Sequence, residues 1–185
     1  MDDLSETLLG LPVLGIACVI DRPGYNARYQ PKYGENRWML CKTAFAIAVE
    51  RAVKYSLGRD RKMRLYVEQS GKSEDRKVKG YYETIRKDGP WFDGAGSSRY
   101  SPLDATAYQS CLYDFKRKTK ESLLMTIADL YLWPMCIGGY HPGNKSYAAL
   151  KEAGKLIDCH LSQDALEEMG IKYSCFEGVQ IKTAT

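Results

Sequence analysis

The longest regular pattern in the sequence is helical. Between Trp38 and Leu57, apolar residues recur three and four positions apart, and Gly58 follows where such a helix would end. This spacing places the apolar side chains on one side of the segment, so we predict a long helix packed against a sheet. A second amphipathic helix is predicted from Ser73, as its N-cap, to Lys87. Its apolar positions are Val78, Tyr81, Tyr82 and Ile85.

Three strands are predicted around these helices. The run from Pro12 to Ile20 is apolar throughout, as in a strand buried on both faces, and Asp21 follows it. Residues 63–69 alternate between apolar and polar types, and Glu68 lies near the end of this segment. The third strand is predicted at 112–115.

The most apolar helix is predicted at 123–133. Its residues are almost all apolar, Asp129 is its one charged residue, and Pro134 follows, so we expect a buried helix that ends there. The remaining segments are predicted as a loop at 91–102 and short helices at 147–157 and 162–169. Strands that alternate with helices indicate an α/β fold, a sheet with helices on its faces.

Length and composition are those of one globular domain. The chain has 185 residues, of which 44% are hydrophobic and 27% charged, so we expect one domain at 1–176 and a tail at 177–185. The net charge is only +4, so nucleic-acid binding would have to depend on local patches. The first residues have no basic leader and no stretch approaches ~20 apolar residues, which favours a cytoplasmic protein without a membrane partner.

The six cysteines contain no close C-x-x-C pair, and we expect them to be reduced. The spacing of Cys136, His141, Cys159 and His160 matches no common set of zinc ligands, so we set a zinc site aside.

Two acids are candidates for a metal site. A carboxylate inside an apolar helix costs on the order of several kcal/mol to desolvate, so Asp129 needs a salt bridge, a cap to a neighbouring loop, or a metal ion. Glu68, at a strand end, is either a solvated residue or a second ligand to the same ion. Carboxylate oxygens suit Mg²⁺ or Mn²⁺, and a shared ion would place the two carboxylates within about 4 to 8 Å. Asp21 and Glu50 are weaker candidates.

A basic run lies just before the Asp129 helix. Lysines beside metal-binding acids would neutralise the phosphates of a nucleic-acid substrate, although such runs are usually a solvated surface. We predict that Lys120 and at least one of Lys116 and Lys118 line the acidic site. The run consists of Lys116, Arg117, Lys118 and Lys120.

The segment from Leu112 to Pro134 resembles the C-terminal signature of a bacterial family, the domain-of-unknown-function family 3800. That signature reads Lys-Ser-Ser-Pro-Leu-Leu-Gln-Leu-Ala-Asp-Leu, and Ala128-Asp129-Leu130 matches its end. Thr126 and Leu123 stand where the signature has Gln and Pro. Further similarity is found at 12–18, 48–52, 66–70, 154–158 and 172–176.

The resemblance implies a ribonuclease H-like mixed sheet flanked by helices, and a metal-dependent nuclease site. It assigns Asp129 to the acid of the last helix, Glu68 to the acid at the end of the fourth strand, and Glu50 to the acid of the first helix. Members of the family begin with a strand that has an Asp-Glu-Ser type motif, and no such strand precedes Pro12. The resemblance therefore implies an N-terminally truncated domain, with a free sheet edge through which the chain would self-associate.

Three hypotheses about function follow. The first is a ribonuclease H-like enzyme that cleaves phosphodiester bonds with Mg²⁺ or Mn²⁺ at Glu68 and Asp129, and that is inactive or nearly so as this chain alone. The second is a non-catalytic fragment that binds nucleic acid or another protein. The third, more remote, is a structural protein without a ligand.

Overall fold

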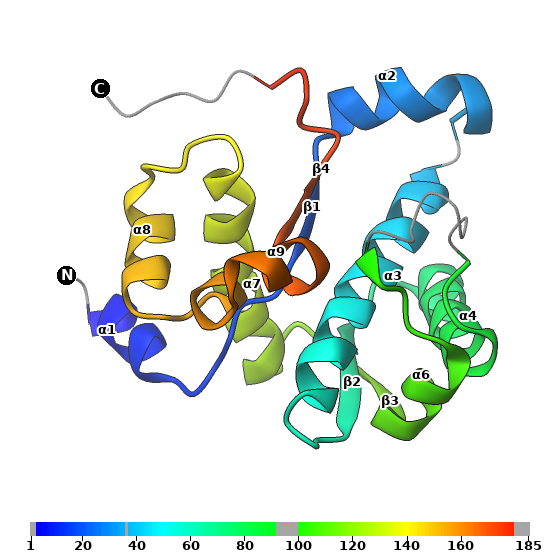
Figure 1. Ribbon diagram of the computed structural model, residues 1–185, viewed down its shortest axis with the longest axis horizontal. Coiled ribbons are helices and arrows are strands. Elements are labelled where there is room, and N and C mark those ends of the chain that lie inside the picture. The colour runs from blue at the N-terminus through cyan, green and yellow to red at the C-terminus, as the bar shows by residue number, and fades with distance from the viewer. Residues whose placement is uncertain (1–2, 36, 92–99, 180–185) are drawn as a thin grey trace.

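The computed structural model describes residues 3–35, 37–91 and 100–179, and Figure 1 shows its arrangement of helices and short strands. The strands are β1 (Cys18–Ile20), β2 (Met63–Glu68), β3 (Leu112–Lys118) and β4 (Lys172–Ser174). The helices are α1 (Asp3–Gly10), α2 (Arg22–Tyr33), α3 (Arg37–Leu57), α4 (Lys72–Asp88), α6 (Ala105–Cys111), α7 (Leu123–Gly138), α8 (Lys145–Glu152), α9 (Gln163–Met169) and the 3-10 helix η2 (Ile157–His160).

The strands form two parallel pairs. β1 pairs with β4, from Cys18 opposite Lys172, and β2 pairs with β3, with Glu68 opposite Lys118. The α/β class is therefore confirmed. The prediction of one sheet is wrong for the described residues, in which the two pairs remain separate two-stranded sheets. A ribonuclease H-like arrangement stays a prediction.

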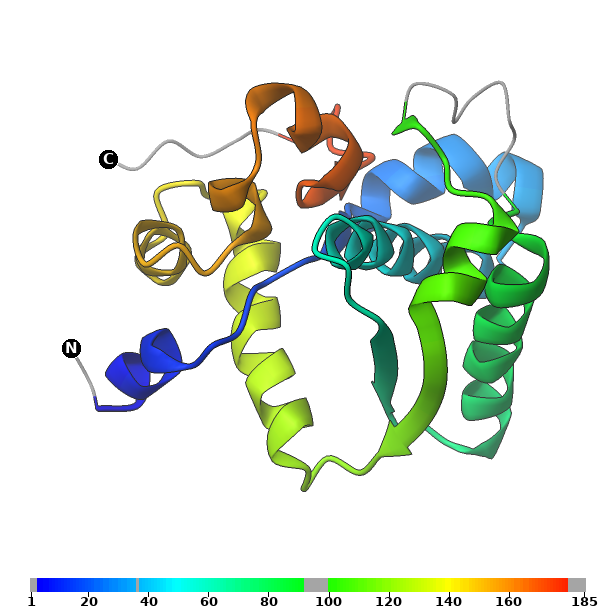
Figure 2. The same ribbon diagram turned by 60° about the horizontal axis from the view of Figure 1, so that its bottom comes forward.

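One apolar core lies on the β2–β3 pair. α3, α4 and α6 cover one face of this pair, as Figure 2 shows. Each helix contributes fully buried side chains, among them Val53, Ile85 and Tyr108, which are all 0% exposed. Burial of an aliphatic side chain of this size stabilises the fold by roughly 1.5–3 kcal/mol, so this face of the sheet is firmly held.

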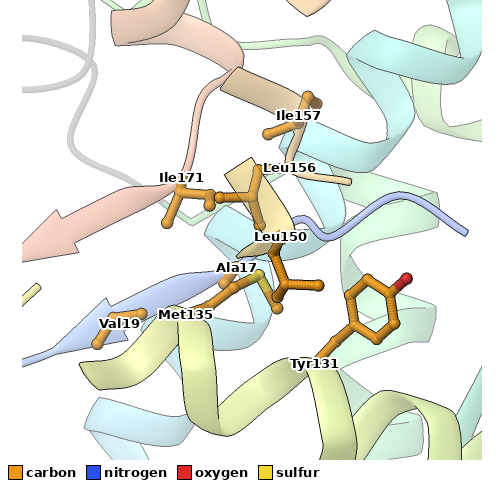
Figure 3. Packing of buried hydrophobic residues seen from close by; sticks show 8 residues of the cluster. All are labelled: Ala17, Val19, Tyr131, Met135, Leu150, Leu156, Ile157 and Ile171. Carbon is orange, nitrogen blue, oxygen red and sulfur yellow. The ribbon is translucent and has the colours of Figure 1, made fainter. Parts of the chain in front are cut away.

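A second apolar core lies on the other side of the molecule. Figure 3 shows its buried residues, which come from β1, α7, α8, η2 and the segment before β4. α3 connects the two regions, because the guanidinium of Arg51 donates hydrogen bonds to the carbonyls of Gly170 and Glu167 at the end of α9. Carbonyls at the end of a helix need partners from outside it, and Arg51 donates to two of them here.

The predicted strand at 12–20 is shorter than expected. Only Cys18–Ile20 is a regular strand, although Gly15 forms an isolated parallel bridge with Leu156. A strand requires a neighbour for its backbone, and β4, the partner of β1, has only three residues. An apolar run in the sequence indicates that the segment is buried, but it does not show how many of its residues pair with a neighbouring strand.

The helices predicted at 38–57, 73–87 and 162–169 are confirmed as α3, α4 and α9, but some of the predicted helix ends are wrong. Ser73 is not the N-cap of α4; Gly71 holds that position without a side-chain bond. Pro134 does not end α7, which continues to Gly138 because the helix end is buried against α8. Helix α2 was not predicted, since its sequence has no clear apolar stripe. The loop prediction at 91–102 lies largely outside the described residues.

Candidate functional site

Glu68 is the last residue of β2, as predicted. Its side chain is 29% exposed, and its Oε1 lies 3.6 Å from Nζ of Lys120, which is 82% exposed. Lys118 is its partner in the neighbouring strand. An ion pair this open to solvent contributes about 0–1 kcal/mol, so Lys120 is free to leave Glu68 for a ligand.

The face of the β2–β3 pair that bears Glu68 is polar and aromatic. Side chains alternate along a strand, so Arg64 and Tyr66 share this face with Glu68. Nε of Arg64 lies 2.9 Å from Oδ2 of Asp114, and its guanidinium also donates a hydrogen bond of 3.1 Å to the Tyr66 hydroxyl. That hydrogen bond lowers the pKa of Tyr66. Most of the polar groups on this face are therefore paired with one another through hydrogen bonds and ion pairs.

Lys116 and Lys118 of β3 lie opposite Tyr66 and Glu68 and extend this face. Lys116 lies 3.7 Å from the Asp114 carboxylate and is 53% exposed, and the Lys118 ammonium lies 5.3 Å from the centre of the Tyr66 ring. The structure places Lys118 and Lys120 beside Glu68, whereas Lys116 lies two residues further back along β3. The basic run belongs mostly to β3 itself, which is longer than the predicted 112–115.

Asp75 is a residue that the sequence interpretation missed. It lies in the first turn of α4, is 7% exposed, and accepts a hydrogen bond of 2.9 Å from the backbone N–H of Ser70. Its other oxygen lies 3.3 Å from Arg117 on β3. These contacts fix the turn that directly follows Glu68. The sequence feature that could have identified Asp75 is its position as an acid in the first turn of a predicted helix.

Asp129 is not buried, and this part of the sequence interpretation was wrong. The residue is exposed in the second turn of α7, so water solvates its carboxylate and no partner is required. α7 buries one side, with Tyr131 and Met135, against the second core. Its opposite side faces solvent.

The two weaker candidates have structural partners. Glu50 is 6% exposed; its Oε1 accepts a hydrogen bond of 3.1 Å from the Leu103 N–H and lies 3.5 Å from Nζ of Lys54. Asp21 is also 6% exposed and caps α2 through the Gly24 N–H, at 2.7 Å. Both carboxylates are occupied within the protein, which disfavours a catalytic role for Glu50.

The chain topology brings the two main acids toward one end of the molecule. β2 and β3 end together, and α7 begins after a short turn from β3, as Figure 2 shows. Within the part of the chain that the structure describes, no group of three or more His, Cys, Asp and Glu side chains is placed to hold a metal ion. A shared ion between Glu68 and Asp129 stays a prediction.

In the described segments, every helix is too short or too polar to cross a membrane.

The chain is similar to an uncharacterised protein, y4pM, of Sinorhizobium fredii (strain NBRC 101917 / NGR234). The two are 34% identical over 179 residues, an alignment that covers 95% of this chain and 64% of the relative. The chain thus spans slightly less than two thirds of that protein's length. No family model and no solved structure matches the chain. The resemblance to family 3800 therefore stays a prediction.

Proposed function

We propose that this chain is part of a metal-dependent, ribonuclease H-like nuclease. In this proposal Glu68 and Asp129 bind Mg²⁺ or Mn²⁺, and Lys116, Lys118 and Lys120 contact the phosphates of a nucleic acid. The observation that supports it is the meeting of an acid and two lysines at the common end of β2 and β3, next to the helix that bears Asp129.

The fit to a metal ion is partial. Carboxylate oxygens are the correct donors for a hard divalent cation, and both acids are partly or fully accessible. Among the described residues, no third His, Cys, Asp or Glu side chain completes a metal-binding group with them. We therefore expect weak metal binding and little or no cleavage by this chain alone, because phosphodiester hydrolysis of this class needs an ion or ions held by several ligands.

A non-catalytic nucleic-acid-binding role is the second candidate. The exposure of Lys116 and Lys120 favours it, since phosphate contacts need no metal ion. Metal dependence distinguishes the two proposals.

The test combines cleavage with calorimetry. Purified chain is incubated with single-stranded, duplex and hybrid substrates, with and without Mg²⁺ or Mn²⁺, beside Glu68→Gln and Asp129→Asn. Measurable metal binding that either substitution abolishes supports the proposal, even without turnover. Absence of metal binding in calorimetry would refute it. Robust turnover that Asp129→Asn abolishes would support the metal site and refute the expectation that this chain is inactive alone.

The phosphate contacts are tested separately. Reversing the charges of Lys118 and Lys120 should weaken nucleic-acid binding and reduce its salt dependence by about one to two phosphate contacts. Lys151→Glu, an exposed change on α8, is the matched control and should have little effect. Equal effects of both changes would show that binding is not localised at β3.

A further inference from the structure

Helix α7 exposes an unusual amount of apolar surface. Leu123 is 72% exposed, Leu124 and Leu132 are each 49% exposed, and Trp133 is 57% exposed. The other exposed large apolar residues of the described chain are Leu57 and Tyr113, so most of them belong to this helix. A group of apolar side chains on one element, in contrast to scattered single ones, indicates an interaction surface.

Strand β2 has a free edge. Its backbone pairs with β3 on one side, and no second strand pairs with it among the described residues. Parallel sheets are normally extended and covered on both faces, and a pair of parallel strands with an open edge is an uncommon end state. The N–H and C=O groups on this edge can accept another strand.

The free edge and the exposed side of α7 belong to the same region. In both Figure 1 and Figure 2, β2 lies between β3 and α7, so its free edge is on the side of α7. The exposed side of α7 is the one opposite the second core, which packs against Tyr131 and Met135. The free edge of β2 and the helix that exposes these apolar residues thus belong to one region of the molecule.

We propose that this surface, defined as the edge of β2 and the exposed side of α7 at Leu132 and Trp133, binds an extended polypeptide segment outside residues 1–185. The segment adds a strand to β2 and packs apolar side chains on α7. Its source is the counterpart of the third or so of the Sinorhizobium fredii protein that the alignment leaves out, since 95% of this chain matches only 64% of that relative.

The chemistry of the surface distinguishes this partner from two others. A nucleic acid would gain little from exposed leucine side chains, because its affinity for proteins comes mainly from basic groups that contact its anionic backbone. A second copy of the chain could pair two α7 helices, but this contact would leave the β2 edge unpaired. A strand with apolar side chains satisfies both halves of the surface.

The experiment uses the rhizobial protein as the source of the probe. The part of it outside the alignment is produced as a separate polypeptide and co-expressed with this chain. We expect the two to copurify, and the double substitution Leu132→Lys with Trp133→Lys to weaken their association by about 30-fold or more, as for a central interface residue. Leu57→Lys, at the end of α3, is the matched control because Leu57 is also exposed, at 38%.

A second measurement avoids dependence on the isolated probe, which could fail to fold. Hydrogen exchange is compared between this chain and the whole rhizobial protein at the positions aligned with β2 and α7. Slower exchange there in the longer protein supports the proposal. Equal exchange, or dimerisation of this chain alone that the α7 substitutions abolish, would overturn it. Because these readouts measure association and not cleavage, their failure leaves the nuclease proposal to its own tests.

Discussion

Two buried tyrosines differ in whether their hydroxyl groups have a partner. Tyr131 in α7 is 3% exposed, and its hydroxyl donates a hydrogen bond of 3.0 Å to the carbonyl of Leu8. Tyr108 in α6 is 0% exposed, and its hydroxyl has no partner among the described residues. Replacing each by phenylalanine removes the same oxygen atom, so the pair separates hydrogen bonding from packing.

The expected changes in the free energy of unfolding have opposite signs. Tyr131→Phe loses one hydrogen bond and leaves the Leu8 carbonyl without it, at a cost of about 1 kcal/mol. Tyr108→Phe removes a buried hydroxyl whose desolvation, at roughly 1–3 kcal/mol, has no compensating bond, so this variant should be at least as stable as the parent and up to about 1 kcal/mol more stable. The two variants should therefore differ by about 1–2 kcal/mol, or roughly 2–8 °C in Tm for a chain of this size.

Urea denaturation followed by circular dichroism measures both variants against the parent. The midpoint should fall for Tyr131→Phe and stay or rise for Tyr108→Phe, with an unchanged m-value. Equal losses in the two variants would refute the reasoning, because they would show that the Tyr108 hydroxyl has a partner or that the ring alone determines stability.

Three further predictions concern single groups. The pKa of Tyr140 is raised from 10.0 to about 12, and burial is the largest of several causes. The unfolded chain therefore loses this proton at a lower pH than the folded chain, so the free energy of unfolding should fall as the pH rises from 10 to 12. This fall should be smaller in Tyr140→Phe. An added Cβ at Gly138 would lie 2.5 Å from an aromatic ring, whereas Gly80 has open space, so Gly138→Ala should lower Tm and Gly80→Ala raise stability by about 0.5–1 kcal/mol. Burial raises the pKa of Cys18 to about 12, so a thiol reagent at pH 8 should modify exposed Cys41 first, unless the chain is denatured. The structure would be contradicted if Gly138→Ala were more stable than Gly80→Ala, or if Cys18 reacted before Cys41. It would also be contradicted if Tyr140→Phe left the alkaline loss of stability unchanged.

Local sequence patterns were sufficient to predict the elements whose periodicity lies entirely within their own residues. The three- and four-residue spacing predicts α3 to within one residue, and the alternation in β2 places Glu68 at its end. In contrast, β1 and β4 are three residues each, and their existence depends on a partner about 150 residues away. Helix α2 begins with a Pro-Gly pair typical of a turn, and Asp21 as its cap was the signal that could have revealed it.

The candidate site was predictable to a similar extent. The strand end at Glu68 and its basic neighbours follow from local sequence, because both lie on regular strands. The environment of Asp129 does not, since an apolar helix in a sequence does not show which of its sides finds a partner. Periodicity identifies residues that share a side of a helix, and only the packing shows that one side of α7 remains exposed.

The pairing of β1 with β4 sets an order for folding during synthesis. The core on β2 and β3 needs only residues between Phe45 and Phe115, so it can form while the rest is still being made. β1 must wait for Lys172, about 150 residues later, which is roughly 8–30 s at the usual rates of translation. During this interval the apolar residues around Val19 lack their final neighbours, so this segment is the one most exposed to chaperones and to aggregation in the nascent chain.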